Sequence, residues 1–250
     1  MTRVAIIGER GRMGAMLMRR LARPGFVETR GADLPLTPEA LHAAIDGADI
    51  VLCCVPAAAM EEVVRLCMPH MREDAVLSDI VSVKVQPMSV MEKLWPGPCV
   101  GTHPLFGPAP APDLELSVCL TPGSRATDAH VELVRDLFSG MGAECFVSNA
   151  EEHDRSVGLI QGINFVTSAA YFALLTEFKD LDRYITPSFV RRQEAARKLL
   201  TEDGELFTWL FEANPFAHES VRKYRSMLNL AAGGDVDLLL QKARAWFKTH

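Results

Sequence analysis

The stretch Val4-Ala5-Ile6-Ile7-Gly8-Glu9-Arg10-Gly11-Arg12-Met13-Gly14 decides the fold of this chain. Its first four residues are apolar and predict a buried strand, and the pattern over residues 12–21 predicts a helix that begins among the glycines. Glycines let another group approach the backbone closely, and the N-terminus of a helix favours phosphate charge. The stretch therefore predicts a dinucleotide-binding turn between a first strand and a first helix, with an ordinary strand-to-helix turn as the alternative.

The glycine pattern departs from the G-x-G-x-x-G motif at one position. Counting back from Gly14, the motif requires glycine at 9, 11 and 14, and position 9 is Glu. Gly8 is expected to take over part of the tight turn, whereas the Glu9 carboxylate would lie near the phosphates unless it points away. The expected cofactor-binding residues of this turn are Gly8, Glu9, Arg10, Gly11, Arg12, Met13 and Gly14.

Two halves of the chain differ in their patterns. Over the first 150 residues, short apolar runs alternate with helical stretches, which is typical of a parallel sheet with crossover helices. Strands are expected at 4–8, 27–32, 50–55, 75–79, 99–101, 116–120 and 145–147, and helices at 12–21, 38–45, 57–71, 87–94 and 127–141. After residue 150 only helices are expected, at 151–176, 188–202, 204–212, 215–232 and 235–248. The predicted fold class is α/β, with a Rossmann-like, mostly parallel sheet domain over 1–150 and an all-α dimerisation and substrate-binding domain over 151–250.

Composition limits the classes of partner. The 250 residues are 48% hydrophobic, enough for substantial cores, and their net charge of −6 comes with no basic run. This gives no support to a nucleic-acid or anionic-membrane partner, so a small-molecule ligand is expected. The six cysteines include no CxxC pair and are expected to be reduced thiols. No uninterrupted apolar stretch approaches about 18 residues, so we expect a cytoplasmic protein without a membrane span.

An acidic residue follows the second predicted strand. Asp33 lies 19 residues beyond Gly14, where an acid commonly bonds the ribose 2′-hydroxyl and disfavours a 2′-phosphate. NAD is therefore expected as the cofactor rather than NADP, although Arg30 nearby keeps NADP open. A simple turn residue is the alternative reading of Asp33. Val55 and Pro56 end a later strand and are expected to contact the same cofactor.

A histidine stands among two prolines and two glycines in the stretch 101–108, Gly-Thr-His-Pro-Leu-Phe-Gly-Pro. Each proline fixes its own φ and keeps the preceding residue out of the helical region, so a stiff loop is expected around His103. An imidazole held in this way suits a general base, since its ordinary pKa of about 6.5 lets it accept a proton near neutral pH. A structural histidine beside a turn is the alternative.

Polar residues follow neighbouring predicted strands. His103 follows the strand 99–101, and Ser82-Val83-Lys84 follows the strand that ends at Asp79. Open parallel sheets bind ligands at the carboxyl ends of their strands. These residues are therefore expected to face the same crevice as the nicotinamide, which favours a catalytic role for His103.

At this point the chain resembles the prephenate dehydrogenase family, which includes arogenate and 4-amino-4-deoxyprephenate dehydrogenases. The matching segments are the glycine turn, Val55-Pro56, residues 79–84, the His-Pro-Leu-Phe-Gly-Pro stretch, and Glu152-His153-Asp154 at the start of a long helix with Ile160-Gln161. The resemblance implies oxidative decarboxylation of a cyclohexadiene in tyrosine-type aromatic biosynthesis. It also implies that His103 removes the proton from the substrate's C4 group, Ser82 orients that histidine or bonds the hydroxyl, and Lys84 binds substrate.

The resemblance further implies cations for the carboxylates of a dicarboxylate substrate. The candidates are Arg191, Arg192, Arg197 and Lys198, with Lys198 at the position of the family's ring-carboxylate arginine. Phe165 replaces a histidine of the family, which implies either a modified substrate, such as the 4-amino analogue, or a hydrogen bond supplied by Asn164 or Gln161 instead. The substrate is therefore left open among prephenate, arogenate and the 4-amino analogue. His153 itself is read as helix N-terminal structure.

Other interpretations remain beside this one. An imine or β-hydroxyacid reductase would share the fold, and a non-catalytic dinucleotide-binding regulatory module would explain Glu9 and Phe165. No metal site is expected, because no second ligand set with suitable spacing accompanies the acidic residues 151–154. The helix 151–176 carries apolar residues on too many faces for a surface helix, so a homodimer through the helical domain is expected.

Overall fold

The computed structural model describes residues 1–248, which form two compact units. The first unit is Met1–His153, and the second begins at Asp154. The expected domain boundary at 150 lies slightly earlier, because the first turn of the following helix, with His153, belongs to the first unit.

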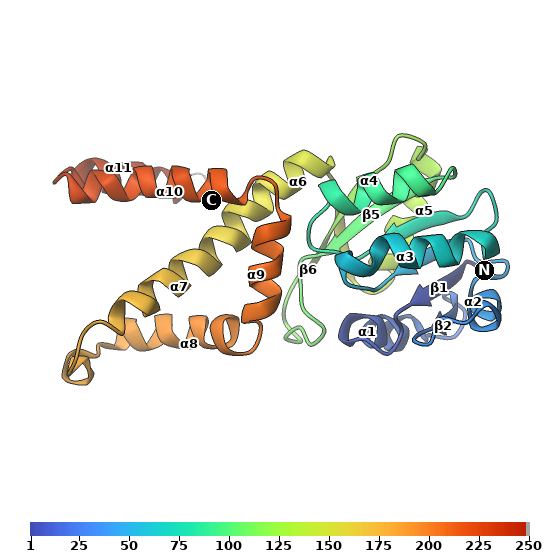
Figure 1. Cartoon of the computed structure of the whole chain (residues 1–250), viewed down its shortest axis with the longest axis horizontal. Helices are drawn as coiled ribbons and strands as arrows, with labels where there is room; N and C mark the ends of the chain where they lie inside the picture. Colours follow the sequence, from blue (N-terminus) through green and yellow to red (C-terminus); the bar gives the residue numbers. More distant parts are fainter. Residues whose placement is uncertain (249–250) are drawn as a thin grey trace. The chain divides into compact units, whose positions relative to one another are not determined.

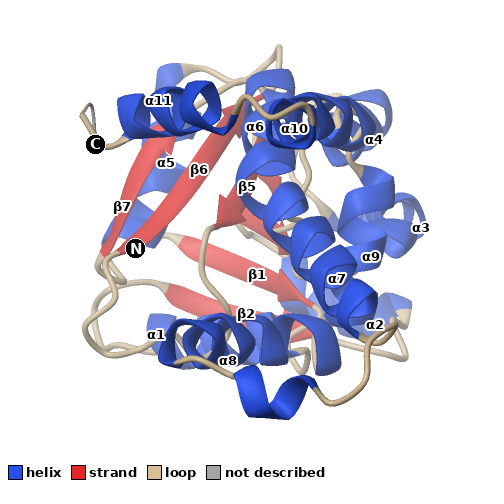
Figure 2. Cartoon of the chain, turned by 90° about the vertical axis from the view of Figure 1, so that its left-hand side faces the viewer, coloured by secondary structure: helices blue, strands red, loops and turns tan. Residues whose placement is uncertain are grey.

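The first unit is built on one sheet of seven strands (Figure 1). The strands are β1 (Arg3–Ile7), β2 (Glu28–Ala32), β3 (Ile50–Cys53), β4 (Val76–Asp79), β5 (Cys99–Pro104), β6 (Leu116–Pro122) and β7 (Ala143–Val147). Their order is β2-β1-β3-β4-β5-β6-β7, and every neighbouring pair is parallel except β5 with β6. Figure 2 shows the strand direction turning from β2 to β7, which is the normal twist of such a sheet.

Helices cover the sheet because the apolar side chains of its strands alternate between two faces. They are α1 (Arg12–Leu21), α2 (Pro38–Ile45), α3 (Ala57–Cys67), α4 (Val85–Leu94) and α5 (Asp128–Ser139), with a 3-10 turn at Met68–His70. Helices α1 and α5 share a buried cluster with Ile6, Leu52 and Val118. The parallel order β2-β1-β3-β4-β5 and its crossover helices agree with the expected Rossmann-like α/β class.

The expected stiff loop around His103 is in part a strand. β5 continues through His103, which is paired with Cys119 of β6, and ends at Pro104. The antiparallel partner β6 explains this extension, because its pairing accommodates the extended backbone that Pro104 imposes on the residue before it. His103 is therefore fixed by sheet pairing, and the loop begins only at Leu105, whose N–H bonds the Ser117 carbonyl.

The second unit contains only helices among its described residues. They are α6 (Ala150–Val157), which starts within the first unit, a π-helical turn at Gly158–Gly162, α7 (Ile163–Leu175), a 3-10 turn at Leu181–Tyr184, α8 (Pro187–Thr201), α9 (Gly204–Ala213), α10 (Ala217–Ala232) and α11 (Val236–Trp246). The single helix expected over 151–176 is thus interrupted by the π-helical turn. A Cβ on Gly158 would lie 3.2 Å from Ser220 Oγ of α10, so glycine permits this close approach.

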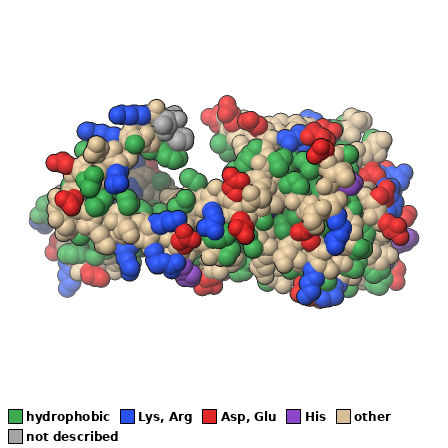
Figure 3. Space-filling model, turned by 90° about the horizontal axis from the view of Figure 1, so that it is seen from above, with side chains coloured by type: hydrophobic (Ala, Val, Ile, Leu, Met, Phe, Trp, Pro, Cys, Tyr) green, Lys and Arg blue, Asp and Glu red, His purple; other side chains and the backbone are tan. Residues whose placement is uncertain are grey.

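The second unit exposes much apolar surface. In the described part of the chain, one stretch, Ala150–Leu175, is long and apolar enough to cross a membrane by length and composition. This qualifies the expectation that no such span exists, and only 11% of its most apolar window is buried. Hydrophobic side chains reach the surface elsewhere in this unit, including Leu228, Leu238 and Trp246 (Figure 3). Apolar surface of this extent is typical of a face that a partner covers.

Candidate active site

The candidate general base is buried at the end of the first unit's central strands. His103 is 3% exposed in β5, next to the carboxyl end of β4. Pairing with Cys119 of β6 fixes its backbone, and the adjacent Pro104 restricts it further. The imidazole is therefore held in one position, which a base in proton transfer requires.

A second histidine meets the first. His153, on α6, is 5% exposed, and its Nε2 lies 2.9 Å from His103 Nδ1. The two rings meet edge to face, with centroids 5.1 Å apart. Because one ring nitrogen of His103 is engaged in this way, its Nε2 is the nitrogen that can accept a proton from a ligand.

Electrostatics keeps His103 neutral. Burial first, and then the neighbouring His153 and Lys84, place the pKa of His103 well below its ordinary value of 6.5. Burial disfavours the charged imidazolium, and nearby positive charge disfavours it further. At neutral pH His103 is therefore an unprotonated imidazole, the form that a general base needs.

Lys84 lies inside the first unit. Its side chain is fully buried, and Nζ lies 2.5 Å from Asp79 Oδ2. Asp79 is also fully buried and accepts hydrogen bonds from the Val81 N–H at 2.8 Å and the Thr102 N–H at 3.3 Å. Burial raises the pKa of Asp79, while Lys84 opposes that rise. This ion pair ties the start of α4 to β4 and β5, and the expected contact of Lys84 with substrate stays a prediction.

Ser82 lies between these groups in the chain. It is half-buried in the turn between β4 and α4, at the carboxyl end of β4. His103 belongs to the neighbouring strand β5. The Ser82 hydroxyl therefore lies at the edge of the sheet where ligands of such folds bind. Its expected role, to orient His103 or to bond the substrate hydroxyl, stays a prediction.

The glycine turn has the shape of a phosphate cradle. Gly8 has a φ of +91°, and a Cβ there would lie 2.5 Å from the Cys54 carbonyl oxygen. A Cβ on Gly14 would collide with the Gly8 carbonyl and come within 2.9 Å of its carbon. Gly11 is the N-cap of α1 and supplies no side chain to cap the helix, and the N-terminus of a helix favours an anion. The turn therefore fits a dinucleotide pyrophosphate.

Asp33 is held at the end of β2. Its Oδ2 accepts from the Arg10 N–H and its Oδ1 from the Leu34 N–H, both at 2.7 Å. Partial burial acts to raise the pKa of Asp33, but these hydrogen bonds and the Arg10 guanidinium hold that pKa below its ordinary value. Asp33 is therefore an ionised acceptor in the place where a ribose hydroxyl binds in this fold.

Two other expected cofactor positions lie beside the turn. Pro56 is the exposed N-cap of α3, and Val55 before it is half-buried. A Cβ on Gly8 would lie 3.2 Å from Val55 Cγ1, so the loop after β3 and the glycine turn are in contact. Arg12 and Met13 open α1, Arg12 exposed and Met13 half-buried.

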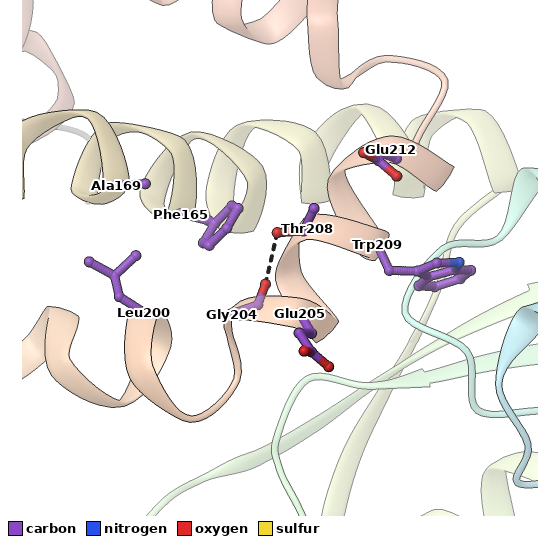
Figure 4. Close-up of a pocket in the computed structure, with 8 residues that line it drawn as sticks. All are labelled: Phe165, Ala169, Leu200, Gly204, Glu205, Thr208, Trp209 and Glu212. Carbon is purple, nitrogen blue, oxygen red and sulfur yellow. Dashed lines mark hydrogen bonds between the residues drawn. The ribbon is translucent and has the colours of Figure 1, made fainter. Parts of the chain in front are cut away.

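Phe165 is packed within the second unit. It stacks on Phe207, with ring centroids 5.7 Å apart, and lines a hollow of about 620 Å³. In Figure 4 the Phe165 ring lies close to Thr208 of α9, and two acids, Glu205 and Glu212, belong to the same lining. Two other residues that were expected to contact substrate are close to Phe165 in sequence: Gln161 is half-buried and Asn164 is exposed.

The expected carboxylate-binding cations lie on α8. Arg191, Arg197 and Lys198 are exposed, and the Arg192 guanidinium lies 3.7 Å from the centroid of the Tyr171 ring. Lys198 Nζ is 3.8 Å from Asp203 Oδ2. Arg197 lines a hollow of about 240 Å³ with Phe172 and Leu200. Arg197 therefore faces a ligand-sized space, whereas Lys198 already has an acidic neighbour.

Two residues of this site were not assigned from sequence. His153 was read as part of a helix N-terminus, and the structure corrects this, since its ring contacts His103. Asp79 was only the end of a strand in the sequence, yet it anchors Lys84. In the sequence, His153 and Asp79 each stand within a recognisable motif, which was the available signal. Their partners, His103 and Lys84, lie 50 and 5 residues away, and the sequence does not show these contacts. In the part of the chain described, no group of three or more His, Cys, Asp and Glu side chains is placed to hold a metal ion.

Comparison with known proteins gives three informative matches. The family model described as the prephenate dehydrogenase nucleotide-binding domain matches residues 27–147. The chain is 32% identical to a probable arogenate/prephenate dehydrogenase of Methanocaldococcus jannaschii over 195 residues, 72% of this chain and 43% of that protein. It is 30% identical to the 4-amino-4-deoxyprephenate dehydrogenase of Streptomyces pristinaespiralis over 190 residues, 68% of this chain and 62% of that protein. The chain thus spans less than two thirds of the length of either relative.

The fold also matches a solved structure. The prephenate dehydrogenase of A. aeolicus, solved with hydroxyphenyl propionate and NAD+, superposes with a TM-score of 0.78 at 20% identity, covering 100% of this chain and 97% of that one. At this identity the likeness concerns the fold alone. The match includes the residues of both units.

Proposed function

Because the chain belongs to the prephenate dehydrogenase family, we propose that it catalyses the NAD-dependent oxidative decarboxylation of prephenate or a close cyclohexadienyl analogue. The product is aromatic, and the reaction belongs to tyrosine-type aromatic amino acid biosynthesis. The observation that carries this proposal is the buried His103, engaged at Nδ1 by His153 and with its pKa well below the ordinary value. It is a neutral base whose Nε2 is available to a substrate.

The proposed reaction uses His103 as its only base. The substrate's C4 hydroxyl, or amine, loses its proton to Nε2 of His103 while C4 transfers hydride and the ring carboxylate leaves as CO2. His153 accepts the Nδ1–H hydrogen bond, which fixes the His103 tautomer whose Nε2 accepts the substrate's proton. Ser82 orients His103 or bonds the substrate hydroxyl. Lys84 holds Asp79 in an ion pair, and its positive charge helps to lower the His103 pKa.

The residues of the glycine turn fit the cofactor that this reaction needs. The cradle of Gly8, Gly11 and Gly14 would hold the pyrophosphate, and Asp33 the ribose. NAD, when bound there, supplies the hydride acceptor, and no metal is needed because the cofactor takes the electron pair. NADP is the less favoured cofactor.

The substrate's second carboxylate needs a cation. We assign it to α8, with Arg197 preferred over Lys198, because guanidinium forms a bidentate fork with carboxylate and Lys198 lies near Asp203. Gln161, Asn164 and Arg191 are further candidate contacts. Phe165 stands where the family has a polar histidine, and its ring stacks on Phe207. This loss of a polar group favours a modified substrate, such as arogenate or the 4-amino analogue, as the second candidate.

The helical unit's exposed apolar face supports a homodimer. Leu159, Ile160 and Leu174 are each at least half exposed along α7 and the turn before it. A second copy of the chain would bury these side chains, and the polar Gln161, Asn164 and Thr167 in the same stretch suit a protein interface. We place this dimer in the cytoplasm, where the six free cysteines would remain reduced.

One comparison tests the activity. NADH formation is measured with prephenate, arogenate and 4-amino-4-deoxyprephenate, on the wild type and on His103→Asn. We expect turnover with one of the three and a loss of at least 10³-fold in the variant, with NADH affinity changed by less than about threefold. The exposed His42 provides the matched control His42→Asn.

Two results would contradict the proposal. A His103→Asn variant that keeps most of its rate would show that His103 is not the base. Bound NADH without turnover of any of the three substrates would favour a dinucleotide-binding regulatory module instead. Arg197→Gln and Lys198→Gln, assayed in parallel, assign the carboxylate contact to the residue whose loss raises KM more.

A further inference from the structure

The side chain of Glu9, which interrupts the glycine motif, has a definite place. A Cβ added to Gly31 of β2 would collide with Oε2 of Glu9 and lie 2.8 Å from its Cβ. The Glu9 side chain therefore lies flat over Gly31, in space that any larger residue at 31 would fill. Its carboxylate is thus directed to β2.

A second acid lies on the same side of this strand. Gly31 and Asp33 are two residues apart, so their side-chain positions share one face of the extended backbone. The Glu9 N–H lies 3.5 Å from the Ala32 carbonyl oxygen, and the Arg10 N–H bonds Asp33. Glu9 and Asp33 therefore both lie at the carboxyl end of β2, where the adenosine ribose of a dinucleotide binds in this fold.

The arginines that could attract a 2′-phosphate here have acidic partners. The Arg10 guanidinium bonds Asp33 Oδ1 at 3.4 Å and also the Leu34 carbonyl. Arg30, which the sequence left open as a phosphate ligand, pairs with Glu28 at 2.6 Å. Each cation is thus at least partly neutralised by a carboxylate of the protein.

We propose that Glu9 is a specificity-determining residue, which with Asp33 forms an acidic ribose subsite that accepts the 2′-hydroxyl of NAD and repels the 2′-phosphate of NADP. The proposal rests on the dinucleotide site of the proposed function. A phosphate monoester carries about −1.5 to −2 charges at pH 7, so each carboxylate within a few ångströms disfavours it. Gly31 serves this subsite by leaving room for Glu9.

Direct binding tests the proposal without turnover. The affinities for NADH and NADPH are measured by the fluorescence of the reduced nicotinamide on the full chain, for the wild type, Glu9→Gln and Asp33→Asn. The control Glu62→Gln makes the same chemical change on the exposed face of α3. We expect Glu9→Gln to shift the NADPH-to-NADH affinity ratio about tenfold toward NADPH, and Glu62→Gln to leave the ratio as in the wild type.

The outcomes separate this proposal from the function on which it rests. If Asp33→Asn shifts the ratio and Glu9→Gln does not, the dinucleotide site stands and the role of Glu9 is overturned. If the wild type binds NADPH as tightly as NADH, the acidic subsite is overturned. If the wild type binds neither, the proposed function itself fails.

A second substitution examines the contact itself. Gly31→Ala would push the Glu9 side chain away from β2, so it should change the affinity ratio in the wild type. In a Glu9→Gly background the same substitution should have no effect, because nothing remains to be displaced. Equal effects of Gly31→Ala in both backgrounds would show that Glu9 is not held over Gly31 in the working site and would overturn the proposal.

Discussion

At the scale of single residues, the site depends on neighbours that tune one imidazole. His103 is buried, its Nδ1 faces His153, and Lys84 contributes positive charge nearby. All three influences disfavour the imidazolium, and burial has the largest effect on the His103 pKa, followed by His153 and then Lys84. A base tuned in this way stays unprotonated well into the acidic range.

The pH dependence of kcat/KM should show this tuning. The base works only when neutral, and its pKa is lowered, so activity should persist as the pH falls through 6.5 and decline only further below it. An acidic limb centred at or above pH 6.5 would contradict a depressed His103 pKa. In His153→Gln, which removes a neighbour that lowers the His103 pKa, the limb should move toward higher pH.

At the scale of elements, the ends of strands and helices bring the site together. The end of β4, the start of α4 and the middle of β5 are joined by one buried ion pair, Lys84 with Asp79. Thr102 of β5 bonds Asp79 through both its N–H and its hydroxyl. The strand that carries His103 is thus tied to its neighbour one residue before this histidine.

Breaking this pair should destabilise the fold. Lys84→Met leaves the Asp79 carboxylate buried without its cation, and the expected loss in the free energy of unfolding is about 3–5 kcal/mol. Denaturant unfolding measures it. The double variant Lys84→Met with Asp79→Asn should recover part of the loss, because it removes the uncompensated charge. A loss below about 1 kcal/mol in Lys84→Met would show that the pair is not fully desolvated in solution.

At the scale of the whole molecule, the two units bury their apolar surface differently. The sheet unit encloses its own core, whereas α7 has no fully buried residue among its 13. A helix that is apolar on several sides needs cover from another chain or from lipid. Because this helix also carries amide and hydroxyl side chains, cover by a second chain in the proposed dimer is favoured over cover by lipid.

Sedimentation tests the proposed dimer. The wild type should sediment as a dimer, and Ile160→Lys, at a side chain that is 67% exposed, should weaken the dimer at least tenfold. Leu66→Lys on α3, where the leucine is 40% exposed, is the matched control and should leave the dimer intact. A stable, active monomer would refute the dimer, and partition of the chain into lipid vesicles would assign the apolar stretch to a membrane.

Much of the fold was predictable because strand and crossover-helix signals are local. The apolar runs at 50–55 and 75–79 became β3 and β4, and the glycine turn opened α1 as expected. The π-helical turn at 158–162 was missed, because the apolar pattern of this stretch does not distinguish it from a regular helix. His103 was expected in a loop and lies in β5, because its pairing with Cys119 joins segments that are distant in sequence.

The sequence by itself determined the α/β class, the phosphate cradle and the candidate base, because each depends on short patterns of apolar, glycine and proline residues. Only the tertiary structure decided what each polar side chain meets. It paired His103 with His153, buried Lys84 against Asp79 and laid Glu9 over Gly31. Burial and partners set the pKa and charge of a group, and both arise only when distant segments pack together.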